Sequence, residues 1–166
     1  MKISAGLAAG LAGTLTVASV HEALRRVSAD APRMDILDVE LIKKGLKCIN
    51  KEVPAAETLQ RWAVAGEVFC DTAYYSLVAV GSKKDVWLRG ASLGLFAGAT
   101  AVILPGPLGL PEEASNKSIS TQLMTIGLYL IGGLAAAAVA KLIDKSQSNS
   151  EPGKSAVPGR THDPSV

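Results

Sequence analysis

The sequence has few of the residues that dominate small soluble domains. It contains two cysteines, seven aromatic residues and only 19% charged residues in 166 positions. Two cysteines exclude a disulfide-stapled secreted miniprotein, and a formal net charge of +2 excludes a strongly basic nucleic-acid-binding protein. Alanine and glycine together make up about a quarter of the chain, and the mean hydropathy is positive at +0.27. This composition favours a small all-α membrane protein.

Long apolar windows predict the helices that cross the bilayer. A hydrocarbon core of about 30 Å requires about 20 largely apolar helical residues. Four windows meet or approach this length, and we expect spans over about 3–20, 62–80, 86–104 and 123–143. The second window is the least hydrophobic, and whether it spans completely is left open. The predicted fold is an integral membrane four-helix bundle.

The first window permits a second interpretation. Lys2, the apolar run after it and the small residues up to Ala18 resemble a secretory signal peptide. However, the run is about 18 residues long, which exceeds the usual signal core, and further apolar windows follow. We therefore favour an uncleaved span, whereas cleavage after Ala18 would leave three spans.

The segments between and after the spans are polar. Residues 33–50 place apolar side chains three and four positions apart among charged ones, which predicts an amphipathic helix. We expect this helix in the membrane interface or over the mouth of the bundle, with a small soluble helical hairpin as the alternative. Residues 146–166 are rich in serine, proline and glycine and are expected to form a disordered tail. The membrane domain is therefore expected to be 1–145.

The spacing of glycines predicts close helix packing. Lipid gives helices little hydrophobic reason to associate, so small residues four positions apart, which let backbones approach, mark packing faces. We expect the first and third spans to cross at the centre of the bundle, flanked by the second and fourth. The predicted packing residues are Gly6, Gly10, Gly13, Gly90, Gly94, Gly98, Gly132 and Gly133.

Two carboxylates interrupt the second window. Glu67 and Asp71 are one helical turn apart and share a helix face. Ionisable groups at membrane depth are costly and usually face the protein interior, which makes these residues candidates for a proton or ion relay. His21 and Glu22, at the end of the first span, complete the candidate set. Ion pairing with nearby arginines and a metal site are the alternatives.

The chain has no recognisable catalytic signature. It lacks the nucleophile elbow, the phosphate-binding loop and paired cysteines, so it does not predict an enzyme, a cofactor or a nucleic-acid partner. It predicts an accessory or scaffold subunit that associates through glycine faces, as a homo-oligomer or in a membrane complex. The alternative is a small proton or cation transporter or channel subunit.

The distribution of basic residues gives a weak preference for one orientation. The turn at 81–89 carries three basic residues, whereas the loop at 106–120 carries one lysine and two glutamates. Because basic residues favour the cytoplasmic side, we expect both termini in the cytoplasm, with the bilayer being a bacterial-type inner membrane.

Overall fold

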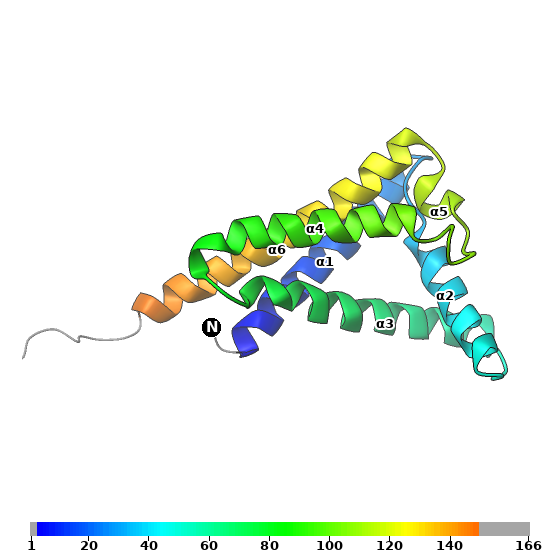
Figure 1. Ribbon diagram of the computed structural model, residues 1–166, viewed down its shortest axis with the longest axis horizontal. Helices are drawn as coiled ribbons and strands as arrows, with labels where there is room; N and C mark the ends of the chain where they lie inside the picture. Colours follow the sequence, from blue (N-terminus) through cyan, green and yellow to red (C-terminus); the bar gives the residue numbers. More distant parts are fainter. Residues whose placement is uncertain (1–2, 150–166) are drawn as a thin grey trace, which may run out of the picture.

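A computed structural model describes residues 3–149, and over this range the chain is helical with no β-strand (Figure 1). Two short 3₁₀ turns, η1 (Leu77–Ala79) and η2 (Lys83–Asp85), connect the third helix to the fourth. The helices are α1 (Ile3–Val27), α2 (Met34–Cys48), α3 (Ala56–Ser76), α4 (Val86–Ile103), α5 (Glu113–Asn116) and α6 (Ile119–Asn149).

Three helical segments are long and apolar enough to cross a membrane. They are Ile3–Val27, Lys83–Ile103 and Ile119–Ser148, which correspond to three of the four predicted spans. The predicted span 62–80 is not among them. The boundaries of this helix also differ from the prediction: α3 begins at Ala56 and ends at Ser76, and the next residues form η1. The carboxylates and other polar residues of α3 are what make this helix less apolar than its neighbours.

Helix α6 lies between α1 and α4 and packs extensively on both. The expected crossing of the first and third spans is therefore wrong, because α1 and α4 barely touch. The physical reason is that α6 carries two adjacent small-residue faces, about 100° apart. Gly132 and Ala136 meet Gly13 of α1, whereas the next residues along the helix, Gly133 and Ala137, meet Gly90 of α4.

The glycines lie where helices of the same chain come together. A Cβ built on Gly94 would lie 2.6 Å from the Tyr129 carbonyl oxygen, and one built on Gly98 would lie 2.6 Å from the Ile126 Cα. On the other side, a Cβ on Gly10 would lie 2.9 Å from the Ser76 backbone nitrogen. A real Cβ atom does not approach a non-bonded heavy atom this closely, so any side chain at these positions would clash. The helix backbones are therefore in direct contact at these glycines.

The last helix is longer than the predicted fourth span. It continues to Asn149, so the boundary of the predicted tail at 146 is corrected, and the rest of that tail, 150–166, lies outside the described residues. Side chains tie this end of α6 to the start of α4. The Lys141 ammonium lies 6.0 Å from the Trp87 ring centroid, and Asp144 pairs with Lys83. These contacts keep α6 attached to the bundle beyond its apolar portion.

Candidate functional site

Helix α2 bridges the gap that opens where α3 diverges from α4 and α6 (Figure 1). Its start is fixed by the Arg33 amide, which donates to the Ala114 carbonyl at 2.7 Å. Met34 and Leu37 then pack against Ala114 in a small core. The side of α2 that carries Asp38 and Leu41 therefore faces the space between α3 and α4.

This space contains two adjoining cavities of about 440 and 260 Å³. The larger one begins beside Tyr74, in the last turn of α3, and Phe96, midway along α4, and continues to Pro105 and Leu108 beyond the end of α4. Most of the lining is apolar. The residues shared by the two cavities are Asp38, Leu41, Cys70, Asp71 and Tyr129.

Three carboxylates face these cavities. Asp38 reaches them from α2 and Asp71 from α3, and Glu67 lines the smaller one. Burial, together with the negative charges of Glu67, Asp71 and Asp35, raises the pKa of Asp38 to about 7. Asp38 therefore changes its charge near neutral pH, inside a cavity that also holds two other acids.

Within residues 3–149 no lysine or arginine pairs with this group, and four of the arginines are engaged elsewhere. Arg25 lies 3.9 Å from Asp35, and Arg26 pairs with Glu22 at 2.9 Å. Their engagement leaves Asp38, Glu67 and Asp71 without a hydrogen bond or ion pair in the described part of the chain. The other two of these four arginines bind elsewhere too: Arg61 pairs with Glu57 at 2.7 Å, and Arg89 donates to the Val78 carbonyl at 3.0 Å.

The other two relay candidates are placed differently. His21 is buried, and its Nε2–H donates to the Pro32 carbonyl oxygen at 2.8 Å. It interacts electrostatically with Glu67 but does not line the cavities. Glu22 is exposed on α1 and is held by Arg26, away from the other acids. The structure thus brings Glu67 and Asp71 together, leaves His21 nearby and excludes Glu22 from the group.

Tyrosines close the inner end of the larger cavity. The Tyr74 hydroxyl donates to the Leu93 carbonyl at 2.8 Å, and the Tyr75 hydroxyl donates to the Tyr129 carbonyl at 2.9 Å. The Tyr74 and Tyr75 rings pack edge to face, with centroids 5.5 Å apart. These contacts tie α3 to α4 and α6 at the end of the cavity that lies farthest from α2.

No protein-family model, curated protein or solved structure matches the chain. The chemistry of the cavity is therefore read from its own side chains. Within residues 3–149 no three or more histidine, cysteine, aspartate or glutamate residues are placed to hold a metal ion together. Carboxylates in an apolar cavity bind a proton or a cation readily, because burial disfavours their uncompensated negative charge.

Sequence reasoning missed Asp38. The signal was present, because Asp38 is four residues after Met34 and three before Leu41, which places it on the apolar stripe of α2. An acid on an apolar stripe faces the protein rather than water. Its partners on α3 were not visible, since the connection between α2 and α3 does not specify how the two helices meet.

Proposed function

We propose that this protein is a small multi-pass membrane protein that takes protons or a small cation into the cavity between α2 and α3, as a transporter or channel subunit. The observation that carries the proposal is the meeting of Asp38, Glu67 and Asp71 at two largely apolar, adjoining cavities, with no hydrogen bond or ion pair to any of the three within residues 3–149. Removing a carboxylate from water disfavours its negatively charged form. Binding a proton or a cation compensates that charge and stabilises the buried group.

The directions of the helices support four passes rather than three. Moving along α1 from Gly13 to Val17, the contacts on α6 move back from Ala136 to Gly132, so the two helices are antiparallel. Helix α4 is antiparallel to α6 in the same way, and α1 and α4 therefore run in the same direction. The chain must return between them through α3. In this proposal α3 crosses with its acids turned towards the cavity instead of the lipid.

In the same proposal α2 lies at the membrane interface on the side opposite the termini. With four passes both chain ends lie on one side, which we propose to be the cytoplasmic side of a bacterial-type inner membrane. Helix α2 then lies across the opposite mouth of the bundle, with Met34 and Leu37 facing inwards. Since the cavity extends towards α2, uptake would begin from that side.

The direct test is ion flux in reconstituted vesicles. Wild-type protein, purified alone and placed in liposomes with an internal pH-sensitive dye, should move protons or a monovalent cation under an imposed gradient. Flux should be lost in Asp38→Asn combined with Asp71→Asn. The matched control is Glu40→Gln, which removes an acid that pairs with Lys43 on the same helix and does not line the cavity. Wild-type flux in the double variant, or none in the native protein, contradicts the proposal.

We keep the accessory or scaffold role as a second proposal, which one observation favours. Leu88, Leu95 and Ile103 are exposed along α4, on a face that does not contact α6. The glycines already contact helices of the same chain, so a partner would bind at this apolar face instead. A photo-crosslinker at Leu95 should then capture a partner or a second copy. A scaffold would also tolerate Glu67→Gln, which a transporter would not.

A further inference from the structure

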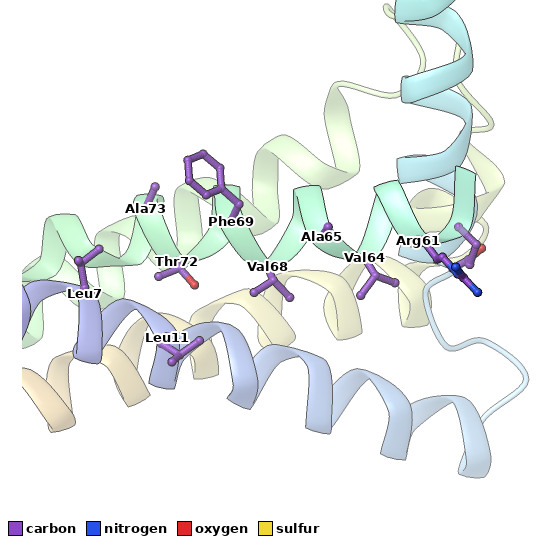
Figure 2. A pocket seen from close by; sticks show the side chains of 10 residues that line it. Leu7, Leu11, Arg61, Val64, Ala65, Val68, Phe69, Thr72 and Ala73 are labelled. Carbon is purple, nitrogen blue, oxygen red and sulfur yellow. The ribbon is translucent and has the colours of Figure 1, made fainter. Parts of the chain in front are cut away.

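A second, apolar groove lies between α1 and α3, and it shares no residue with the carboxylate cavities (Figure 2). Its volume is about 800 Å³. Leu7 and Leu11 line it from α1, and Val64, Val68 and Phe69 line it from α3. Three of these side chains, Leu7, Val64 and Phe69, are at least half exposed in the isolated chain, Phe69 by 75%. Exposed apolar surfaces of this size are usually covered by lipid or by another protein segment. The shape of the groove indicates which of these binds.

The groove is a wedge. At its narrow end the two helices touch, with the Thr14 and Thr72 hydroxyl oxygens 3.3 Å apart and the Gly10 backbone against Ser76. Figure 2 shows α1 and α3 separating from this contact towards Arg61. The space therefore widens along α3 from Ala73 to Arg61, and Gln60 lines the wide end beside Arg61.

The dimensions of the groove favour a flexible chain over a helix. From Arg61 to Ala73 is about 18 Å along α3. The volume of about 800 Å³ over this length gives a mean cross-section of about 45 Å², against about 80 Å² for a helix about 10 Å across. The length is also close to half of the roughly 30 Å hydrocarbon core, which is the depth of a single leaflet. The groove thus matches the hydrocarbon part of one lipid.

The wide end has the chemistry of the headgroup region. Trp62 is half exposed there, and tryptophan concentrates at the membrane–water interface. Arg61 is next to it, with an exposed guanidinium whose one partner among residues 3–149 is the exposed Glu57, at 2.7 Å. Such an exposed pair contributes little, so a phosphate can compete for the guanidinium and accept two hydrogen bonds from it.

We infer that the α1/α3 groove binds an anionic phospholipid, with its acyl part along Val64 and Val68 and its phosphate on Arg61. This site is separate from the proposed ion cavity, and it requires only that α1 lies in the bilayer. The bound lipid would cover the apolar side of α3, while the acids on the adjacent side of that helix stay in the cavity. It would therefore let a helix of modest hydropathy remain at membrane depth.

The test compares two lipids that differ in headgroup charge. The full chain is reconstituted in vesicles with equal amounts of phosphatidylglycerol and phosphatidylcholine, and retained lipids are measured by native mass spectrometry. Wild-type protein should retain one lipid per chain, with phosphatidylglycerol preferred. Arg61→Gln should lower that preference about fivefold, the effect of one basic residue at an anionic surface. Lys84→Gln, which removes a charge at the opposite end of the bundle, should leave it unchanged.

A second pair of variants tests the acyl part of the site. Ala65 is exposed and lines the groove, so Ala65→Trp should fill it and abolish lipid retention. Leu95→Trp adds the same ring to the outer face of α4 and should retain the lipid. Equal retention of both lipids by the wild type, unchanged preference in Arg61→Gln, or retention in Ala65→Trp would each overturn the inference. So would a dimer that Ala65→Trp dissociates, because a second copy would then occupy the groove.

Measuring ion flux in the same variants separates this inference from the proposed function. Ala65→Trp should still fold and still move ions, since Ala65 does not line the carboxylate cavities. Loss of lipid retention with normal flux supports the lipid site by itself. Lipid retention in a protein that moves no ions supports the lipid site and contradicts the proposed function.

Discussion

The carbonyl oxygen of Gly133 lies only 2.5 Å from the position that a Cβ would occupy on Gly90. Helices α4 and α6 are therefore in backbone contact, and this contact continues at Gly94 and Gly98. Dispersion between closely packed backbones is a principal source of helix association in lipid, because the hydrophobic effect does not favour protein over lipid contacts there. The close approach of α4 and α6 is possible because Gly90, Gly94, Gly98 and Gly133 have no side chain.

This contact makes the effect of a single methyl group predictable. Gly94→Ala places a Cβ 2.6 Å from the Tyr129 carbonyl and 2.7 Å from the Leu130 Cα, and the two helices must separate. We expect a loss of about 1–3 kcal/mol in the free energy of unfolding, the usual cost of overpacking. Gly94→Leu should abolish stable assembly. Unfolding of the detergent-solubilised protein measures both effects.

The matched control for this prediction is Gly127→Ala on α6. Nothing lies within 4 Å of a Cβ built at Gly127, so the same chemical change meets no neighbour. Its unfolding midpoint should equal that of the wild type or exceed it slightly. If Gly94→Ala and Gly127→Ala unfold at the same midpoint, α4 and α6 are not in backbone contact at Gly94.

The Tyr75 hydroxyl should contribute measurably to stability. Tyr75 is completely buried, and its hydroxyl donates to the Tyr129 carbonyl at 2.9 Å. Tyr75→Phe keeps the ring and removes this bond, so we expect a loss of about 1 kcal/mol. Tyr75→Ala also removes the ring that packs against Gly13 and Gly132, and should cost about 3–5 kcal/mol. Equal unfolding midpoints for wild type and Tyr75→Phe would show that the hydrogen bond adds nothing.

The sequence predicts the positions of the apolar helices more directly than any other feature of the fold. A run of about 20 apolar residues is a local property, and the three most apolar windows correspond to helices long enough to cross a membrane. The partner of each helix is not a local property. Gly90, Gly94 and Gly98 indicate a packing face, but their spacing does not say that α6 covers it and α1 does not.

The candidate site likewise has one part that neighbouring residues in the sequence predict and another that depends on how the helices pack. Glu67 and Asp71 share a face because they are one turn apart, which the sequence alone indicates. Asp38 joins them only because α2 folds back across the gap, fixed by the contact between Arg33 and Ala114. A hydrogen bond between backbone atoms leaves no trace in the sequence, so this third acid was not predictable as a partner.

Asp38 should make stability fall as the pH rises. Its pKa is about 7 in the folded protein and about 3.9 in an unfolded chain. Between about pH 4 and about pH 7 the folded state therefore binds more protons than the unfolded state, and raising the pH favours unfolding. Asp38→Asn removes this penalty, so its advantage over the wild type should grow across that range and level off above it.

Thermal unfolding in detergent at several pH values measures this prediction. The useful quantity is the difference in midpoint between Asp38→Asn and the wild type at each pH. Glu40→Gln, a change on the same helix outside the cavity, is the control and should show no comparable growth. A difference for Asp38→Asn that is constant from acid to neutral pH would mean that Asp38 is solvated in the folded protein.

The two cysteines report on access to the cavity. Cys70 lines both carboxylate cavities, and Cys48 ends α2 at the mouth; both are exposed. Because the larger cavity extends towards α2, a membrane-impermeant maleimide should reach both residues from the same side. Cys48→Ala and Cys70→Ala isolate each signal, since the chain has no other cysteine. With cytoplasmic termini, both should react in intact cells.

The pattern of reaction separates the explanations. Reaction of Cys48 alone means that the cavity is closed to water and that Asp38, Glu67 and Asp71 are not reached from α2. Reaction of both residues only after the cells are opened keeps the cavity but reverses the orientation, because the mouth then faces the cytoplasm. Reaction from opposite sides contradicts the arrangement itself, since Cys70 would then be reached past the hydrogen bonds of Tyr74 and Tyr75.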